Sequence, residues 1–172
     1  IIEEFIHGQN LKEALDSEGY FTEQEVRRMG TQLCDALAIL HANGIIHRDI
    51  KPSNIILTAR GDIKLIDFGS SRELKNSSMD TTILGTPGYA PPEQFGFSST
   101  DVRSDIYSLG ITLKELAGNA TSSSFNKIIQ SCTELDPKRR LASAKEVKNL
   151  LANKHAYKKS LMAIALVVCF CL

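Results

Sequence analysis

Four polar side chains in the middle of the chain have residue types and a spacing that suit phosphoryl transfer. They occur in two short stretches, D-I-K-P-S-N at residues 49–54 and D-F-G at residues 67–69. An aspartate beside a lysine can orient a hydroxyl group while the cation neutralises a transferring phosphoryl group. The oxygens of Asn54 and Asp67 suit Mg²⁺, which keeps several waters and shares its coordination with substrate phosphates. These residues therefore predict a phosphoryl-transfer site, or half of one.

These two stretches resemble the catalytic loop and the metal-binding turn of protein kinases of the eukaryotic type. Residues 47–54 read H-R-D-I-K-P-S-N, and D-F-G follows at residues 67–69, in the order found in that family. Either motif alone could belong to an ordinary surface loop, whereas the two together favour the kinase interpretation. The resemblance implies that the parent protein uses ATP and Mg²⁺ and phosphorylates a protein substrate.

The resemblance also implies a role for each polar residue of the two stretches. Asp49 and Lys51 are the expected catalytic residues, because the carboxylate would accept the proton of the substrate hydroxyl and the ammonium would steady the γ-phosphoryl group. Asn54 and Asp67 are the expected Mg²⁺ ligands. The residues expected to bind ATP are Glu4 and Ile6 through their backbone, Lys51, Ser53, Asn54 and Ile56.

The apolar residues between the two stretches predict the element that holds them together. Residues 55–57 and 63–66 flank a turn that contains Gly61, a pattern typical of a β-hairpin. The two ends of a hairpin lie side by side, and here they carry Asn54 and Asp67. We therefore expect the hairpin to bring both metal ligands to one place.

Apolar residues at helical spacing predict that most of the remaining elements are helices. The longest begins at a capping box formed by Thr22 and Glu25. His47 and Phe68 are expected to pack the catalytic loop onto the core. The other expected elements are the end of a strand at residues 1–6 and helices that start near Leu11, at Ser104, at Phe125 and after Ser143. The predicted fold class is α+β and mainly α-helical, the large lobe of a protein kinase with a short β-hairpin and without the small lobe.

Residues 70–93 resemble the activation segment of a Ser/Thr kinase. The first half of this segment is rich in Ser, Thr, Asn and Lys, a composition typical of a mobile loop. Thr81 and Thr82 are the main candidates for phosphorylation, and the alternative is that they are ordinary solvated loop residues. A phosphate there is expected to bind Arg48 and Arg72, because arginine clasps phosphate oxygens bidentately.

The end of the segment reads G-T-P-G-Y-A-P-P-E and carries a signal for the substrate class. Thr86 matches the threonine that contacts the catalytic aspartate and lysine in kinases that phosphorylate Ser or Thr. The resemblance also implies two structural contacts. Glu93 is expected to form a buried ion pair with Arg140, and Asp105 to bind the backbone of the turn at residues 47–49.

Length and composition limit the remaining classes of protein. A chain of 172 residues is expected to form one domain. Its 20 basic and 20 acidic residues balance, Trp is absent and aromatic residues are few, so no nucleic-acid partner is expected. The four cysteines form no C-x-x-C pair and favour a reducing, cytosolic compartment, with Cys34 and Cys132 in the core.

The sequence also departs from a complete kinase domain in two places. The glycine-rich loop, strand lysine and partner glutamate of the small lobe have no counterpart, so residues 1–152 are interpreted as the C-terminal lobe of a kinase domain truncated at its N-terminus. The isolated chain is expected to be inactive or weak. Only Thr121–Ser124 separate two predicted helices where most kinases insert a substrate-docking helix.

Residues 161–172 form a wholly apolar run after a basic juxtamembrane linker at residues 153–160. The run is shorter than the roughly twenty residues of a spanning helix, so we interpret it as the start of a transmembrane helix in the plasma membrane. Lysines before it would keep the kinase domain cytoplasmic under the positive-inside rule. The alternatives are a helix docked on the core and a short tail anchor.

Three functions are compatible with these features. The first is a membrane-anchored Ser/Thr protein kinase of bacterial type, with a dimer that autophosphorylates the activation loop. The second is a non-catalytic, kinase-like module that binds partners. The third is a small-molecule phosphotransferase, which the activation segment disfavours. The complete set of catalytic residues in the large lobe favours the first.

Overall fold

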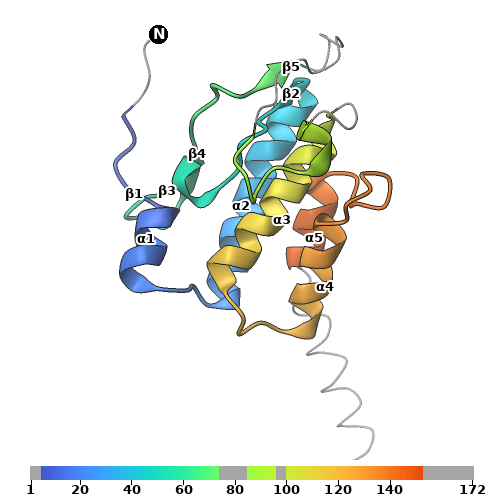
Figure 1. Ribbon diagram of the computed structural model, residues 1–172. Coiled ribbons are helices and arrows are strands. Elements are labelled where there is room, and N and C mark those ends of the chain that lie inside the picture. The colour runs from blue at the N-terminus through green and yellow to red at the C-terminus, as the bar shows by residue number, and fades with distance from the viewer. Residues whose placement is uncertain (1–4, 74–84, 96–99, 153–172) are drawn as a thin grey trace, which may run out of the picture.

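Helix α2 (Glu23–Ala42) is the longest element and lies at the centre of the fold (Figure 1). The computed structural model describes residues 5–73, 85–95 and 100–152. Helices α3 (Val102–Ala117) and α5 (Ala144–Ala152) pack against α2, and α4 (Ser123–Cys132) packs against both of them. The remaining elements are α1 (Leu11–Glu18), the 3₁₀ helices η1 (Pro52–Asn54) and η2 (Pro92–Phe95), and the strands β1 (Gln9–Asn10), β2 (Ile45–Ile46), β3 (Ile55–Leu57), β4 (Ile63–Leu65) and β5 (Arg72–Glu73).

Helix α2 begins where the sequence places its capping box. The Thr22 hydroxyl accepts a hydrogen bond from the Glu25 backbone N–H at 3.3 Å, and the Thr22 N–H donates to the Glu25 carboxylate at 2.8 Å. The Thr22 hydroxyl also donates to the Glu25 carboxylate at 2.6 Å, and this bond together with that from the Thr22 N–H lowers the pKa of Glu25. The capping box satisfies N–H groups that have no partner within the helix. One face of α2 is fully buried, with Val26, Leu33 and Leu37 in the core.

Helices α3 and α4 approach each other closely at Gly110. A Cβ atom on Gly110 would lie 2.6 Å from the Cβ of Cys132, so a larger residue there would push the two helices apart. Cys34 on α2 is buried in the same core cluster. Burial raises the pKa of each thiol, of Cys34 and of Cys132, to about 12. Both cysteines are therefore un-ionised core residues, as predicted.

Strands β2 and β5 form a small sheet at one end of α2, and β1, β3 and β4 form a second sheet beside α2, next to α1 (Figure 1). Strands β3 and β4 are the predicted hairpin, and they pair antiparallel with Ile55 opposite Leu65. Strand β1 joins the other edge of β3, with Asn10 opposite Ile56. The fold is α+β and mainly helical, which confirms the predicted class.

The structure corrects the predicted bounds of two elements. Phe5 and Ile6 are not in a strand, and the first strand is β1, two residues after His7. Helix α3 begins at Val102 rather than at Ser104, because the Asp101 carboxylate accepts a hydrogen bond from the Arg103 N–H at 2.7 Å and caps the helix earlier.

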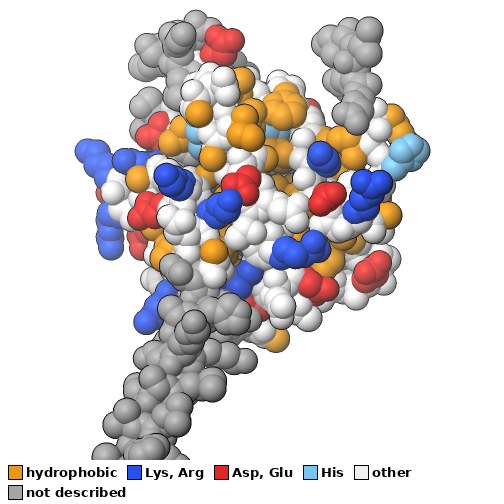
Figure 2. Space-filling view, turned by 180° about the vertical axis from the view of Figure 1, so that it is seen from behind, with side chains coloured by type: hydrophobic (Ala, Val, Ile, Leu, Met, Phe, Trp, Pro, Cys, Tyr) orange, Lys and Arg blue, Asp and Glu red, His pale blue; other side chains and the backbone are white. Residues whose placement is uncertain are grey.

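The surface of the described part of the chain carries charges of both signs. Figure 2 shows Lys and Arg side chains interspersed with Asp and Glu on the face seen from behind. No helix among residues 5–73, 85–95 and 100–152 is long and apolar enough to cross a membrane. The predicted basic linker at residues 153–160 and the apolar run at residues 161–172 lie outside the described residues.

Candidate active site

The buried carboxylate of Asp105, on helix α3, fixes the backbone of the turn at residues 47–49. Its oxygens accept hydrogen bonds from the backbone N–H groups of His47 at 2.9 Å and of Arg48 at 2.8 Å. Asp105 is fully buried, and a buried carboxylate needs such donors because its desolvation is otherwise very unfavourable. The contact is the one that the sequence predicts, and it ties the loop to the central helices.

Two residues of the site have a left-handed backbone conformation. Among the described residues, Arg48 and Asp67 are the non-glycine residues with positive φ, at 69° and 64°. Such conformations are unfavourable for side chains with a Cβ atom and persist only where the surrounding structure holds them. Their concentration in the two predicted stretches, at residues 47–54 and 67–69, marks this region as a functional candidate.

Asp49, Lys51 and Thr86 form a closed ring of polar contacts. The Lys51 ammonium lies 2.7 Å from Asp49 Oδ2 and donates to the Thr86 hydroxyl at 2.7 Å, and that hydroxyl donates to Asp49 Oδ1 at 2.7 Å. Thr86 reaches this ring from a segment 37 residues further along the chain. The sequence predicts all three members of the ring.

The ring keeps the Asp49 carboxylate ionised. Burial would raise the pKa of Asp49, but the bonds from Lys51, Thr86 and Asn54 outweigh burial, and the net effect lowers the pKa. Oδ1 accepts one hydrogen bond, from Thr86, although a carboxylate oxygen has two lone pairs. Asp49 can therefore accept a further hydrogen bond from a hydroxyl group of a substrate.

Asn54 and Asp67 stand at the open end of the β3–β4 hairpin. The Asn54 amide donates to the Asp49 backbone oxygen and to Asp49 Oδ2, both at 2.9 Å, so its carbonyl oxygen is the atom left for a ligand. The Ile66 N–H donates to the backbone carbonyl of Asn54 at 2.9 Å, and this bond joins the ends of the two strands. Asp67 is exposed, and its Oδ1 accepts from the Gly69 N–H at 3.1 Å.

One amide oxygen and one carboxylate fit Mg²⁺, which takes few protein ligands and fills its octahedron with water and phosphate oxygens. Among the described residues, no group of three or more His, Cys, Asp or Glu side chains could hold a metal ion. The donors at the hairpin end thus suit a magnesium ion that is shared with a nucleotide.

His47 connects the catalytic loop to the strand that precedes Asp67. Its ring lies 3.4 Å from the Asp49 N–H through Nδ1 and 3.2 Å from the Ile66 carbonyl through Nε2. Burial lowers the pKa of His47, so the ring is neutral at pH 7. His47 is fully buried, in agreement with its predicted packing role.

Phe68 contacts the catalytic loop at His47. Its ring meets the His47 ring edge to face, with 5.1 Å between the centroids. Half of its surface is nevertheless exposed, at 50%. The contact with the fully buried His47 ring agrees with the predicted packing role of Phe68, although Phe68 itself is not a core residue.

The segment before α1 lies against the hairpin near the residues predicted to bind ATP. A Cβ atom on Gly8 would lie 2.5 Å from both Ile56 Cγ2 and the Leu57 carbonyl oxygen, so only glycine allows this approach. Ile6 and Ile56 are each partly exposed, and Ser53 is exposed. Glu4, predicted with Ile6 to contact the nucleotide, lies outside the described residues.

Of the two arginines predicted to receive a phosphate, Arg72 lies at the start of the activation segment and Arg48 contacts that start from the catalytic loop. The Arg48 Nε–H donates to the Ser70 carbonyl at 2.8 Å. Strand pairing places Arg72 opposite Ile46, two residues before Arg48 in the chain. Thr81 and Thr82, the candidate phosphorylation sites, lie outside the described residues.

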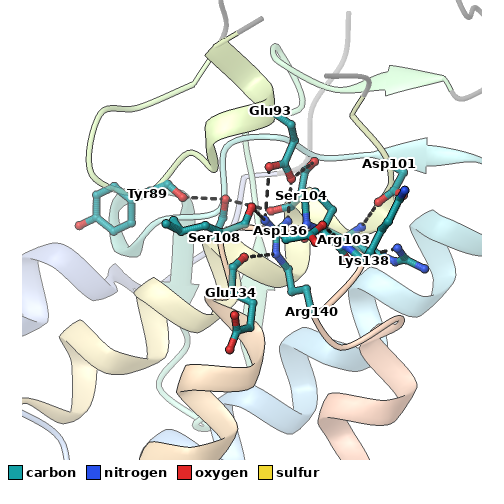
Figure 3. Close-up of polar contacts among 12 residues, drawn as sticks. Tyr89, Glu93, Asp101, Arg103, Ser104, Ser108, Glu134, Asp136, Lys138 and Arg140 are labelled. Atoms are coloured by element: carbon teal, nitrogen blue, oxygen red, sulfur yellow. Dashed lines mark hydrogen bonds and ion pairs between the residues drawn. The ribbon is translucent and has the colours of Figure 1, made fainter. Parts of the chain in front are cut away.

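Behind the catalytic loop, Glu93 and Arg140 form a buried ion pair (Figure 3). Arg140 Nη1 lies 2.6 Å from Glu93 Oε1, and the Ser104 hydroxyl donates to the same oxygen at 3.0 Å. Arg140 also donates to three backbone carbonyls, at 2.7 Å to Arg103, at 3.0 Å to Glu134 and at 3.5 Å to Leu135. The pair ties the end of the activation segment to α3 and to the turn before α5.

Several polar residues support the site without any signal in the sequence motifs. The His41 ring on α2 contacts Asp105 Oδ2 at 2.8 Å, and the Gln94 amide donates to the Arg48 carbonyl at 2.8 Å. The Tyr89 hydroxyl donates to Glu115 on α3, and together with burial this raises the pKa of Tyr89. These residues lie far from their partners in sequence, so spacing alone could not reveal them.

Comparison with known proteins places these motifs in one family. The protein kinase domain matches residues 1–121. The chain is 40% identical over 120 residues to the probable serine/threonine-protein kinase PknB of Corynebacterium glutamicum, covering 67% of this chain and 19% of that protein. It is 39% identical over 119 residues to the serine/threonine-protein kinase PknB of Mycobacterium leprae, again covering 67% and 19%.

A third relative extends the similarity toward the last helix. The probable serine/threonine-protein kinase CPE1738 of Clostridium perfringens is 30% identical over 178 aligned positions, which cover 86% of this chain and 26% of that protein. The chain thus spans between a fifth and about a quarter of the length of these curated relatives.

Proposed function

Because the chain belongs to the protein kinase family, we propose that it forms the large lobe of a Ser/Thr protein kinase that transfers the γ-phosphoryl group of ATP to a protein hydroxyl group. The observation that carries this proposal is the ring of contacts between Asp49, Lys51 and Thr86. An ionised acid with a spare lone pair lies beside a partly exposed ammonium, an arrangement that suits phosphoryl transfer.

In the proposed reaction, the residues of the chain position a hydroxyl group and neutralise charge. Asp49 Oδ1 accepts a hydrogen bond from the substrate hydroxyl and takes its proton as the new O–P bond forms and the bond to the leaving phosphate breaks. Lys51 neutralises charge on the transferring group. Mg²⁺ bound with the nucleotide neutralises the phosphates, and Asn54 and Asp67 would hold it.

The nucleotide is proposed to lie between the segment before α1 and the β3–β4 hairpin. Glu4 and Ile6 would contact the adenine through their backbone, with Ile56 against its face. Lys51, Ser53 and Asn54 would face the phosphates. The close approach of Gly8 to Ile56 supports this proposal, because it brings the first described residues to the hairpin.

The proposed acceptor is a Ser or Thr side chain of a protein. Thr86 supports this choice, because its hydroxyl contacts both Asp49 and Lys51, and the three relatives above carry names of serine/threonine-protein kinases. We further propose Thr81 and Thr82 as phosphorylation sites, phosphorylated within a dimer. Arg48 and Arg72 would bind the added phosphate.

The tail of the sequence supports a proposed location. Residues 1–152 would form the kinase lobe, residues 153–160 a basic juxtamembrane linker and residues 161–172 the start of a transmembrane helix. The proposal places the kinase lobe in the cytoplasm, on the side where basic residues flank a spanning helix.

The proposed reaction is tested by transfer of labelled γ-phosphate to Ser- and Thr-containing proteins, with the full-length protein that carries this chain. Asp49→Asn should lower the transfer rate about 10²- to 10⁴-fold, since it removes the proton acceptor but keeps the shape of the side chain. Asp62→Asn, at an exposed position in the hairpin turn, is the control and should leave the rate unchanged. Full activity in Asp49→Asn would overturn the mechanism. Absence of transfer by the unaltered protein would favour a non-catalytic, partner-binding module.

A further inference from the structure

The β3–β4 hairpin is held at both of its ends, and one of these anchors has no role in the proposed reaction. At the open end, the hairpin carries Asn54 and Asp67. At the closed end, the turn around Gly61 lies against α2, where Arg28 and Gln32 stand one helical turn apart. Residues at i and i+4 share one face of a helix, so both side chains reach the same turn.

Gln32 makes two hydrogen bonds to the backbone of the hairpin with its one amide group. Its Oε1 accepts from the Ile63 N–H at 2.8 Å, and its Nε2 donates to the Gly61 carbonyl at 3.4 Å. Strand β4 is an edge strand of its sheet, and an edge strand has backbone groups without a partner in the sheet. The Gln32 amide therefore pairs with β4 much as a neighbouring peptide group would.

Arg28 adds a second contact to the same turn. Its Nη1 donates to the Gly61 carbonyl at 2.9 Å. Gly61 has a φ of 81°, and a Cβ atom there would lie 3.0 Å from both terminal nitrogens of the guanidinium group. The turn thus requires glycine at this position, and its contact with the Arg28 guanidinium group holds it against α2.

The hairpin is short enough for its contacts with α2 at the closed end to influence the position of the metal-binding residues at the open end. Asp67 follows Ile63 by four residues, about 13 Å of extended chain. The two strands are hydrogen-bonded along their whole length. At the closed end the Thr58 N–H donates to the Asp62 backbone carbonyl at 3.0 Å, and at the open end the Ile66 N–H donates to the Asn54 backbone carbonyl at 2.9 Å. Gln32 holds the turn and β4 but not β3, so a slide of β4 along β3 at Ile63 would move Asp67 relative to Asn54.

We propose that Gln32, assisted by Arg28, is a positioning residue that sets the distance between Asn54 and Asp67. This inference rests on the proposed function, in which these two residues hold Mg²⁺. Gln32 itself touches neither metal nor substrate and acts through β4. The proposal adds helix α2 to the parts of the lobe that determine metal binding.

The first test is amide hydrogen exchange of the 172-residue chain, measured by NMR. Gln32→Met keeps the length of the side chain and removes both hydrogen bonds. We expect about tenfold faster exchange at Ile63, which loses its acceptor, and also at Ile66, at the far end of the hairpin. Faster exchange at Ile63 with unchanged exchange at Ile66 would show a purely local clamp and would overturn the proposal.

Two further variants control this test. Gln32→Glu keeps an oxygen that can accept from Ile63, and should restore most of the protection at both amides. If Gln32→Met does not fold, Gln32→Ala takes its place, because it also removes both hydrogen bonds and suits a helix, and the same two outcomes at Ile63 and Ile66 decide. Gln130→Met changes an exposed glutamine that has no side-chain hydrogen bond among the described residues, and should change neither amide.

The second test is the Mg²⁺ dependence of nucleotide binding in the full-length protein that carries this chain. Gln32→Met should raise the Mg²⁺ concentration for half-maximal ATP binding by about three- to tenfold and leave metal-free ATP binding unchanged. A residue that only supports stability would lower the melting temperature without this selective change. If the unaltered protein shows no Mg²⁺ dependence, the metal assignment of the proposed function fails, and the exchange at Ile66 still decides whether Gln32 positions the hairpin end.

Discussion

Two clusters of opposite charges, one around Asp49 and one around Arg140, use the same chemistry in different ways. In each cluster an acid and a base lie within 2.7 Å of each other, and a distant segment contributes one member, Thr86 in the first and Arg140 in the second. The side chains of Arg140 and Glu93 are 0% and 3% exposed, whereas those of Lys51 and Asp49 are 21% and 10% exposed. Access to solvent is therefore the first difference between them.

The second difference is whether any hydrogen-bonding capacity remains. Arg140 donates to Glu93 and to the backbone carbonyls of Arg103 and Glu134, so its N–H groups are occupied by partners inside the protein (Figure 3). Asp49 retains a lone pair on Oδ1, on the side of Thr86. A cluster whose groups are fully used and fully buried stabilises the fold, while one with remaining capacity at the surface can take a ligand.

Removing one partner of the buried cluster should therefore have the largest effect on stability. Arg140→Met should lower the free energy of unfolding by about 3 to 5 kcal/mol, because it leaves the Glu93 carboxylate buried without its counter-charge. Asp49→Asn should lower the same quantity by less than about 1 kcal/mol. Denaturant titration of the chain measures both.

The matched control is Arg139, the neighbour of Arg140. Its side chain is 73% exposed and lies 3.9 Å from Glu134. Arg139→Met should change the free energy of unfolding by no more than about 0.5 kcal/mol. Equal effects of Arg139→Met and Arg140→Met would remove the basis for treating the buried cluster as structural.

Substitutions in the cluster around Asp49, which we call the open cluster, should change activity rather than stability. Thr86→Val removes the hydroxyl that donates to Asp49 and accepts from Lys51, and should lower phosphoryl transfer about 10- to 100-fold, since loss of 1.4 to 2.8 kcal/mol is expected for two polar contacts. Thr86→Ser keeps the hydroxyl and should stay within about threefold of the unaltered protein. Initial-rate assays on the full-length protein decide this, and similar losses in both variants would argue that the methyl group, not the hydroxyl, matters.

A third cluster, at the start of α2, should show its effect through pH. Partial burial would raise the pKa of Glu23, but bonds from the Ser122 N–H, from Arg27 and from the Ser122 hydroxyl outweigh it and lower the pKa from 4.5 to about 2. A lowered pKa stabilises the fold above pH 4.5, and this contribution is lost as the pH falls toward 2.

Glu23→Gln should therefore reduce the loss of stability between these two pH values by about 1 to 2 kcal/mol, allowing for solvent screening. Denaturant titrations at several pH values between them measure this change. Glu18→Gln is the control, because Glu18 is exposed, and it should leave the pH profile unchanged. A pH profile of Glu23→Gln that matches that of the unaltered chain would exclude this contribution.

The smallest effect is expected at an exposed pair between α2 and α5. Lys148 Nζ lies 2.6 Å from Asp35 Oδ1, but the two side chains are 40% and 58% exposed. Lys148→Met should change the free energy of unfolding by less than about 0.5 kcal/mol at low salt and by nothing measurable in 1 M salt. A larger or salt-independent change would mean that solvent exposure does not determine how much an ion pair contributes to the stability of this protein.

The parts of the site that follow local patterns could be predicted from the sequence. Short apolar runs on either side of the turn at Gly61 predict the hairpin, and the hairpin brings together Asn54 and Asp67. The capping box at Thr22 fixes the start of α2. Each of these predictions depends on residues close together in the chain, where period and turn chemistry are strong signals.

The remaining parts depend on contacts between distant segments. His41 and Asp105 are separated by 64 residues, and Gln32 and Ile63 by 31, so no local pattern connects them. The exposed half of the Phe68 ring could not be predicted for the same reason, since burial is set by segments that pack from elsewhere in the chain.

The most direct test of the comparison is whether the open cluster takes a ligand. We would titrate ATP into the full-length protein that carries this chain, in Mg²⁺ and in a metal chelator, by calorimetry. The account predicts that Mg²⁺ tightens ATP binding at least about tenfold, and that Asp67→Asn removes this gain while Arg139→Met does not. Equal affinity for ATP with and without Mg²⁺, unchanged by Asp67→Asn, would contradict the assignment of this cluster to phosphoryl transfer.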